Sequence, residues 1–534
     1  MPRYYLTTPI YYVNDRPHIG HAYTTLVADA LARWRRMGGD DVRFLTGTDE
    51  HGQKSARAAA GRGLDPQAHV DEMAEAWKAN WDRLEIRYDR FIRTTDPDHR
   101  AVVQAALDRL KGGTTPAGEP LLYESAYVGW YCVSDERYWT DKDVADGRCP
   151  ECGRAVEQIE ERNWFFRMSA FHDALVGHIQ AHPGFIHPES RANEVLGFLR
   201  EPLGDLCISR PRERLPWGIP FPWDDAYVTY VWVDALLNYV TGTVDPAPGE
   251  SPGETAERAI AAWNAHPADV HLIGKDILTT HSVYWTTLLM ALGWELPRSI
   301  LAHGWWLWEG GKMSKSVGNM VRPDDLVPDF GVDGLRYYLL REMALGQDST
   351  YSYESILQRL NADLANDFGN LLSRVARMVE RYLEGRLPRR AEVAGVEAGE
   401  AELAERARSL TGGPGAPGSV AEAWEAWRIH GALGRVMGLV GAANEYLERR
   451  QPWKRIKEEG GPLEVAATLL HAAEAVRLAA ALLWPVAPEL SARALGAFGR
   501  SAPPPPDELR WGVLDGERVE PGAPLYARLE PAAP

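Results

Sequence analysis

Cysteine is scarce in this sequence, with 4 residues in a chain of 534. So few cysteines cannot form the disulfide framework of a small secreted scaffold. The chain begins directly in a pattern typical of a β-strand, where we expect no signal peptide. We therefore expect a protein of the reducing cytoplasm, in which paired cysteines serve as metal ligands.

Long apolar runs and positive charge are also lacking. We find no apolar run approaching about 20 residues, the length needed to span a membrane, and expect no membrane partner. The chain has 58 Lys and Arg against 75 Asp and Glu, for a formal net charge of −17. This balance excludes a protein that coats nucleic acid nonspecifically, so an RNA partner would have to contact local basic patches.

The first turn of the first helix carries three residues suited to a nucleotide. Residues 4–8 predict a buried parallel strand, and a helical pattern begins near His18. Backbone N–H groups and the helix dipole favour an anion there. Gly20 lets a nucleotide approach the backbone closely, and His18 and His21 can donate to phosphate. Alone, the pattern fits two surface histidines equally well.

A glycine-flanked loop at residues 310–319 supplies a second signal. It carries Lys312, Ser314 and Lys315, and ammonium groups on a flexible loop suit a polyphosphate whose charge moves during reaction. A solvated basic loop is the alternative. Taken together, His18-Ile19-Gly20-His21 and Lys312-Met313-Ser314-Lys315-Ser316 resemble the two signatures of class I aminoacyl-tRNA synthetases, in the same order.

Alternating strand and helix patterns predict an α/β fold with a Rossmann-type parallel sheet. We expect strands at residues 42–45, 227–232, 270–273 and 299–302, and helices at 66–81 and 99–111. A segment of short aromatic strands and turns, with one helix at 171–182, is expected to split the sheet as a small insertion. Asp49 and His51 follow the second strand, so we expect both to face the same crevice as His18.

The C-terminal part predicts an α-helical bundle. Long helical patterns cover residues 361–383, 420–450 and 463–483. Residues 386–417, rich in Gly, Pro, Ala and Glu, are expected to form a long connection that is partly disordered. The tail is expected to pack back on the body.

We divide the chain into six regions. They are residues 1–115 and 223–300, the two halves of the Rossmann domain; 116–222, the connective insertion with a candidate zinc knuckle; 301–360, the lysine loop and stem-contact region; 361–500, the helical bundle; and 501–534, the tail.

Further motifs extend the resemblance over nearly the whole chain. They are Tyr230-Val231-Trp232-Val233-Asp234-Ala235, His271-Leu272-Ile273-Gly274-Lys275-Asp276, Gln451-Pro452-Trp453 and Pro524-Leu525-Tyr526-Ala527-Arg528-Leu529-Glu530. With them the chain resembles the methionyl-tRNA synthetase family. The resemblance implies that L-methionine is activated with ATP to methionyl-adenylate and transferred to the 3′ end of tRNA(Met), releasing AMP and pyrophosphate. It also implies that the bundle binds the anticodon, and we expect Mg²⁺ to accompany ATP.

The resemblance also assigns roles to residues. Catalytic positions are His18, His21, Lys312 and Lys315, and ATP-binding positions add Gly20, Gly274, Asp276 and Ser314. The methionine pocket matches Ile10, Tyr12, Trp232, Ala235, Leu236, Tyr239, Ile277, His281 and Trp285, and Asp49 matches the position that holds the α-amino group. Aromatic rings suit a thioether, since S–aromatic contacts contribute about 0.3–1.5 kcal/mol each. Taken singly, such aromatic residues are usually core.

Three residues match the positions that read the anticodon in this family: Asn370, Arg374 and Trp453. Asn370, Arg374 and Arg377 share one helix face by their spacing. An unpaired base can stack on indole or guanidinium, and an amide can bond its edge. A solvated basic face with Trp453 as core is the alternative.

A candidate metal site lies in the insertion. Cys149 and Cys152 have the spacing of a zinc knuckle, and Cys132 with Asp135 is the candidate second half. Many relatives have a cysteine where Asp135 stands, and carboxylate oxygen also binds zinc. One structural Zn²⁺ per chain is therefore possible. The alternative is three free thiols in a small fold held by aromatic residues.

Two other functions stay open at this point. One is a class I synthetase for cysteine or a branched aliphatic amino acid, against which the aromatic pocket argues. The other is a non-catalytic tRNA-binding relative, against which the intact histidines and lysines argue. No appended oligonucleotide-binding barrel is evident, so we expect a monomer.

Overall fold

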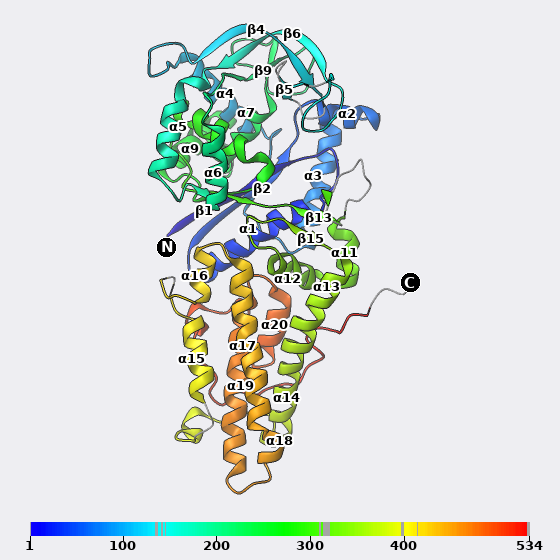
Figure 1. Ribbon diagram of the computed structural model, residues 1–534, viewed down its shortest axis with the longest axis vertical. Helices are drawn as coiled ribbons and strands as arrows, with labels where there is room; N and C mark the ends of the chain where they lie inside the picture. Colours follow the sequence, from blue (N-terminus) through cyan, green and yellow to red (C-terminus); the bar gives the residue numbers. More distant parts are fainter. Residues whose placement is uncertain are drawn as a thin grey trace.

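The protein is elongated, with an α/β part at one end and a bundle of helices at the other (Figure 1). The computed structural model describes residues 2–133, 137–139, 143–144, 146–308, 311–312, 321–396, 400–413 and 415–530.

A six-stranded parallel sheet forms the centre of the α/β part. Its strand order is β3-β2-β1-β11-β12-β7. The strands are β1 (Arg3–Tyr12), β2 (Asp41–Asp49), β3 (Arg90–Arg93), β7 (Ile186–His187), β11 (Val270–Gly274) and β12 (Ile300–His303). The strands predicted at residues 4–8, 42–45, 270–273 and 299–302 are thereby confirmed. The Rossmann-like parallel sheet predicted from the sequence is present.

Helices cover both faces of this sheet. Along β1, Tyr4 and Leu6 join the core under α1 and α3, whereas Tyr5 joins the core under α4, α9 and α10. Successive residues of a strand point to opposite faces, so both faces are apolar. The helices are α1 (Ile19–Met37), α2 (Gln53–Gly61), α3 (Pro66–Arg83), α4 (Pro97–Gly112), α9 (Pro252–Ala265) and α10 (Thr286–Leu292). The two helices predicted at 66–81 and 99–111 correspond to α3 and α4.

The strand predicted at residues 227–232 is wrong. Only β10 (Tyr227–Thr229) is extended there, and it pairs antiparallel with β9 (Ser209–Pro211) outside the main sheet. Val231 begins α7 (Val231–Leu236), which α8 (Asn238–Thr241) follows. A short buried apolar run has the same pattern in a helix as in a strand, so hydrophobicity could not separate them. The edge strand is instead β7, which falls within residues 116–222.

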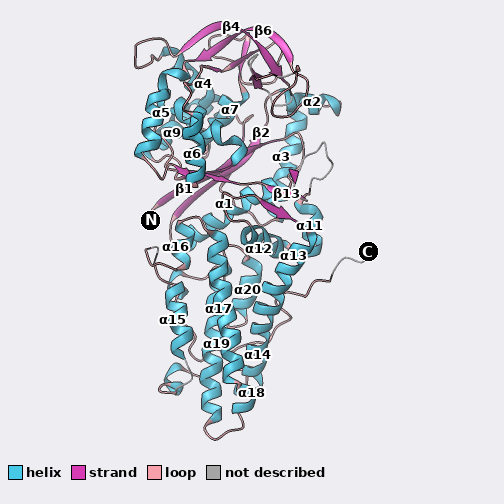
Figure 2. Cartoon of the chain, viewed as in Figure 1, coloured by secondary structure: helices cyan, strands magenta, loops and turns pink. Residues whose placement is uncertain are grey.

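The insertion forms a small antiparallel sheet at the far end of the molecule, drawn in magenta in Figure 2. Its order is β5-β4-β6-β8. The elements are β4 (Leu122–Cys132), β5 (Arg137–Trp139), β6 (Glu157–Phe166), β8 (Leu206–Cys207), a 3₁₀ turn at Met168–Phe171, α5 (His172–Ala181) and α6 (Glu189–Phe198). Helix α5 confirms the prediction at 171–182.

A short segment connects the sheet to the bundle. It contains β13 (Trp306–Trp308), β14 (Gly311–Lys312), β15 (Ser349–Tyr351), α11 (Pro323–Phe330), α12 (Val332–Glu342) and α13 (Tyr353–Leu360). Arg336 on α12 is fully buried; it forms an ion pair with Asp29 on α1 and donates to the carbonyls of Leu84, Pro485 and Val486. One side chain thus joins the α/β part to the bundle.

The bundle follows the predicted pattern with two corrections. It contains a π-helical turn at Asn361–Gly369, α14 (Asn370–Leu383), α15 (Glu400–Leu410), α16 (Val420–Glu425), α17 (Ile429–Arg450), α18 (Pro452–Arg455), α19 (Gly461–Leu483) and α20 (Pro488–Gly496). The helix predicted at 420–450 is interrupted at Trp427, whose φ is +54°. The connection at 386–417 contains a 3₁₀ turn at Arg390–Val393 and α15, so its middle is helical rather than disordered.

Helix α19 corrects the expectation about apolar runs. By length and composition it could cross a membrane, with a mean hydropathy of 1.5 over its most apolar window, yet that whole window is buried inside the protein. It is therefore the core helix of the bundle. The tail packs along the bundle as far as it is described, with a 3₁₀ turn at Pro506–Glu508, and Glu474 of α19 accepts hydrogen bonds from the backbone of Gly512, Val513 and Leu514.

Candidate active site

A cavity of about 420 Å³ opens beyond the carboxyl ends of the central strands. Ligands of open parallel sheets bind at this edge. Fourteen of the predicted ATP and methionine residues line it, namely Ile10, Tyr12, His18, Gly20, His21, Asp49, Trp232, Ala235, Leu236, Tyr239, Gly274, Asp276, Ile277 and His281. The first-turn histidines and the aromatic cluster therefore share one cavity.

His18 and His21 cap the first turn of α1 reciprocally. The backbone N–H of Gly20 donates to Nδ1 of His18 at 3.0 Å, and the backbone N–H of His18 donates to Nδ1 of His21 at 3.3 Å. A nitrogen that accepts cannot carry the proton, so the neutral form of each ring is protonated at Nε2. The proton of each ring therefore lies on the nitrogen that does not bond to the helix backbone.

The imidazole of His18 lies too close to Gly20 to leave room for a side chain there. A Cβ at this position would lie 2.9 Å from Cε1 of His18. Any side chain would displace the imidazole that caps the helix. Glycine at this position therefore keeps His18 in its capping position, in addition to leaving room for a nucleotide.

The aromatic end of the cavity is made by residues of β1, α7, α8 and the segment before α10. Tyr12 and Trp232 meet edge to face, with ring centroids 6.3 Å apart. Nδ1 of His281 lies 2.9 Å from the carbonyl of Ile277, and Nε2 lies 2.7 Å from the hydroxyl of Tyr239. Burial lowers the pKa of His281 to about 4. The ring is neutral at pH 7; it donates through Nδ1 to Ile277 and accepts the Tyr239 proton at Nε2.

Trp285 lies behind this end rather than in it. It is fully buried, its ring centroid is 5.9 Å from that of Tyr239, and its indole N–H donates to Nε2 of His271 at 3.1 Å. The other nitrogen of His271 faces the Thr7 hydroxyl at 2.7 Å. Burial lowers the pKa of His271 well below its ordinary value, so the chain Trp285–His271–Thr7 is neutral. Trp285 thus supports the wall formed by Tyr239.

The prediction that His51 faces the crevice is wrong: Asp49 lines the cavity and His51 does not. Nδ1 of His51 lies 2.7 Å from one carboxylate oxygen of Asp234, and Nε2 of His99 lies 2.9 Å from the other. Burial alone would raise the pKa of Asp234, but attraction to His51 and hydrogen bonds from both histidines lower it to about 2. This buried trio fixes α7, which carries Trp232, against the loop after Asp49.

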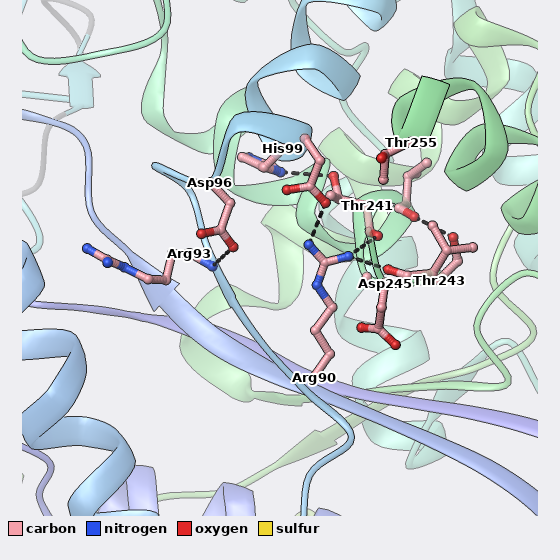
Figure 3. A network of polar contacts seen from close by, with 12 residues as sticks. Arg90, Arg93, Asp96, His99, Thr241, Thr243, Asp245 and Thr255 are labelled. Atoms are coloured by element: carbon pink, nitrogen blue, oxygen red, sulfur yellow. Dashed lines mark hydrogen bonds and ion pairs between the residues drawn. The ribbon is translucent and has the colours of Figure 1, made fainter. Parts of the chain in front are cut away.

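A second polar network holds α8 from the same side (Figure 3). Arg90 on β3 donates to the carbonyl of Thr241 at 2.9 Å and pairs with Asp98 at 2.6 Å. His99 reaches the hydroxyl of Thr241 at 3.0 Å. Since Tyr239 lies on α8, these contacts from the first half of the sheet position a wall of the cavity.

Asp276 also lines the cavity, and its side chain is exposed. The Trp305 indole donates to its carboxylate at 3.2 Å. Lys275 is turned away: it pairs with Asp348 at 2.7 Å, and its ammonium lies 4.0 Å from the Trp305 ring centroid. Of these two neighbours, only Asp276 lines the cavity.

Most of the lysine loop lies outside the described residues. Lys312 is described only in its backbone, in β14, which pairs with β13; Ser314 and Lys315 lie outside the described residues. The segment just after the loop lies beside the start of α1: the backbone N–H of Ile19 donates to the carbonyl of Val321 at 2.9 Å. Val321, which follows the loop, therefore contacts the first turn of α1.

Three cysteines of the insertion converge. The sulfurs of Cys132, Cys149 and Cys152 all lie within 4.8 Å of one another, and those of Cys132 and Cys152 are 3.5 Å apart. Tetrahedral zinc with Zn–S bonds of about 2.3 Å holds sulfurs about 3.8 Å apart. The three thiols therefore fit one metal ion, while Asp135, the fourth predicted ligand, lies outside the described residues.

The predicted anticodon residues meet near the free end of the bundle. Asn370, Arg374 and Arg377 line one hollow of about 430 Å³ between α14 and α17. The guanidinium of Arg374 lies 5.6 Å from the ring centroid of Trp453 on α18 and pairs with Glu448 at 2.6 Å. The three helix-face residues and the indole thus form one continuous surface.

Several cavity residues were not predicted. They are Pro9, Tyr11, Asn14, Asp15, Arg16, Tyr23, Thr24, Asn238, His303, Gly304, Trp305 and Trp306. Asn14, Asp15 and Arg16 were within reach of sequence reasoning, because they follow the first strand and precede the helix turn. His303, whose pKa burial lowers, reaches the Thr24 hydroxyl at 2.7 Å. Only the tertiary structure could reveal that contact.

Comparison with known proteins gives a consistent picture. The model of a family described as tRNA synthetases class I (M) matches residues 4–160 and 154–376. The Methionine--tRNA ligase of Caldanaerobacter subterraneus subsp. tengcongensis is 42% identical over 99% of this chain and 79% of its own length. That of Streptomyces coelicolor is 43% identical over 99% of this chain and 98% of its own. The solved structure of Mycobacterium tuberculosis methionyl-tRNA synthetase in complex with methionyl-adenylate has a TM-score of 0.88 at 40% identity, and the match covers 98% of this chain and 100% of that one.

Proposed function

The chain belongs to the methionyl-tRNA synthetases, a class I family, and we propose that the cavity beyond the central strands is where it joins methionine to AMP. It is a methionine–tRNA ligase, which uses ATP and releases AMP and pyrophosphate. A single observation carries the assignment of the site: the two histidines of the helix turn and the aromatic niche line the same cavity.

The first step needs positioning and charge stabilisation, with no covalent enzyme intermediate. A carboxylate oxygen of methionine bonds to the α-phosphorus of ATP as the bridging oxygen leaves with pyrophosphate. His18 and His21 donate to phosphate oxygens through Nε2, and Lys312, Ser314 and Lys315 act on the charge that develops. Gly20 and Gly274 leave room for the nucleotide, and Asp276 accepts from the ribose.

The substrate methionine occupies the aromatic end. Asp49 binds its α-amino group, and the side chain lies among Ile10, Tyr12, Trp232, Ala235, Leu236, Tyr239, Ile277 and His281, with Trp285 supporting the wall behind. Since His281 is neutral and already accepts the Tyr239 proton, its ring presents no full charge to the thioether. Aromatic carbon and uncharged dipoles suit a polarisable sulfur.

The second step involves tRNA(Met). We propose that Asn370, Arg374 and Trp453 contact the anticodon, and that residues 301–360 contact the stem near the acceptor end. The hollow beside Trp453 offers guanidinium and indole faces for unpaired bases. For the other regions we propose the roles expected from the sequence. Residues 1–115 and 223–300 form the catalytic domain, 116–222 the connective insertion, and 501–534 a tail that packs back on the body.

Two metals are proposed. The cysteine cluster can bind a metal, and we propose that this is one structural Zn²⁺ ligated by Cys132, Cys149 and Cys152, with Asp135 completing the set. Mg²⁺ accompanies ATP and neutralises phosphate charge. We also propose that the enzyme acts as a monomer in the cytoplasm.

Amino-acid-dependent ATP–pyrophosphate exchange tests the function directly. Across a panel of the twenty amino acids, methionine should give the dominant exchange rate. Faster exchange with cysteine or a branched aliphatic amino acid would assign the enzyme to another class I synthetase. Silence with every amino acid, together with retained tRNA binding, would identify a non-catalytic relative.

A further inference from the structure

We propose that the guanidinium of Arg16 binds the β- and γ-phosphates of ATP, the part of the nucleotide that leaves as pyrophosphate. This inference rests on the proposed function of the cavity. It adds a residue that lies outside both signature motifs, in the loop between β1 and α1.

Arg16 lines the cavity two residues before His18, the cap of α1. Its side chain is exposed at the open side of the cavity. Within the described part of the chain, its guanidinium makes no hydrogen bond and no ion pair; only the backbone N–H of Arg16 donates, to the Asp15 carboxylate at 2.7 Å. The five N–H donors of the side chain are therefore left for a ligand.

The neighbouring carboxylates are already engaged. A carboxylate oxygen of Asp15 lies 3.5 Å from the guanidinium of Arg322, a residue just past the lysine loop. Glu72, on α3, is paired with Arg62 at 2.7 Å, and its pKa is lowered chiefly by that hydrogen bond and only in small part by Arg16. The charge of Arg16 is thus not cancelled by either group.

The cavity otherwise has little permanent positive charge. Among the described residues that line it, Arg16 is the only lysine or arginine, whereas Asp15, Asp49 and Asp276 all contribute carboxylates. ATP brings a highly charged triphosphate into this space. Guanidinium matches phosphate by paired hydrogen bonds and keeps its charge at every working pH.

The position of Arg16 selects the outer phosphates. Tyr239 and His281 of the methionine niche are buried, the histidines of the helix turn are half-buried, and Arg16 is exposed. A nucleotide whose α-phosphate meets His18 and His21 directs its β- and γ-phosphates outwards, towards Arg16 and the segment after the lysine loop. When the bond from the α-phosphorus to the bridging oxygen breaks, the electron pair stays on pyrophosphate, and the guanidinium stabilises that charge.

Arg16→Met tests this inference. We expect the KM for ATP in methionine-dependent exchange, and the KM for pyrophosphate in the reverse reaction, each to rise at least about tenfold, as for loss of a charge-assisted hydrogen bond. The KM for methionine should change less than about twofold, within the spread of an unrelated surface change. Affinity for a non-hydrolysable methionyl-adenylate analogue, which has no β- or γ-phosphate, should also stay constant.

Two further variants make the result specific. Arg16→Lys retains one charge and should recover part of the loss. Arg100→Met, an exposed arginine on α4 outside the cavity, should behave as the parent enzyme.

Equal ATP and pyrophosphate constants in parent and Arg16→Met would overturn the inference, while active exchange in the parent would leave the enzyme assignment intact. A rise confined to the KM for tRNA would also overturn it, by assigning Arg16 to RNA. Equal weakening of the adenylate analogue would show a general disturbance of the loop and would count against it too.

Discussion

Hydrogen bonds inside the cavity determine which nitrogen of each imidazole can donate. Backbone N–H groups occupy Nδ1 of His18 and His21, so Nε2 is the donor in both rings. The Ile277 carbonyl has the opposite effect on His281, whose Nδ1 must carry the proton. The sequence predicted all three histidines as site residues, but proton positions depend on contacts between distant segments and could not be predicted.

The depressed pKa of His281 predicts how the stability of the fold depends on pH. Its pKa of about 4 lies below the ordinary value of 6.5, because burial disfavours the charged ring. An unfolded chain takes up this proton near pH 6.5 and the folded one only near 4. The contribution of His281 to the free energy of unfolding is therefore fully present above pH 6.5. It is lost as the pH falls, by up to about 1.4 kcal/mol per pH unit.

For substrate binding, we expect the KM for methionine to be independent of pH in the neutral range. The KM for methionine, measured by pyrophosphate exchange with saturating ATP, should stay constant from about pH 8 to 6 and rise as the pH approaches 4, where the ring becomes charged. The KM for ATP at the same pH values is the control. A methionine-specific inflection near pH 6.5 would show that His281 titrates normally and that the neutral pocket is wrong.

Long helices and most strands of the main sheet were predictable, whereas a strand that runs directly into a helix and a short helix flanked by glycine and proline were not. Helices α3, α4 and α19 and strands β1, β2, β11 and β12 followed from apolar periodicity. The run 227–232 failed because three strand residues and a helix share one uninterrupted apolar segment. Helix α15 was missed because glycine and proline flank it, although Leu403, Ala407 and Leu410 have helical spacing and are buried.

The cysteine cluster gives a prediction at the scale of the small sheet. Protein purified without chelator should contain about one zinc per chain, the stoichiometry of a closed structural site. Cys149→Ser should lower that ratio towards zero, because hydroxyl is a poor zinc ligand and one of three converging thiolates is lost.

Cys207→Ser is the matched control. Cys207 belongs to the same four-stranded sheet but is not part of the cluster, so this variant should retain its zinc. A ratio near zero in the parent protein would remove the metal from the proposal and leave three free thiols.

At the scale of the molecule, the two predicted contact sites lie far apart, one in the α/β part and one in the bundle. The cavity opens on the sheet, whereas Trp453 lies on α18 at the free end (Figure 1). Helix α17 has 22 residues, which corresponds to a length of about 33 Å at about 1.5 Å per residue. Periodicity predicted the bundle itself, but the contact of Arg374 on α14 with Trp453 on α18 could be seen only in the fold.

Separation of the sites predicts separable activities. Trp453→Ala should reduce kcat/KM for tRNA charging by about 5-fold to 150-fold, the loss expected from about 1–3 kcal/mol of base stacking. Methionine-dependent pyrophosphate exchange should stay within about twofold, as for a change far from the reacting atoms.

The exposed Leu463, at the same end of the bundle, supplies the comparison. Leu463→Ala should leave both assays unchanged. Equal losses in charging and exchange for Trp453→Ala would contradict the division of labour between the two ends.

The buried Arg336 has a consequence for how the protein meets its RNA. A single guanidinium binds Asp29 of α1 and three carbonyls, two of them where the chain turns after α19. A pivot at that point would separate four N–H donors of the guanidinium from their acceptors, so these contacts oppose a hinge there. We therefore expect the proposed anticodon surface and the cavity to keep a fixed separation, so that the bending needed for a productive complex occurs in the tRNA.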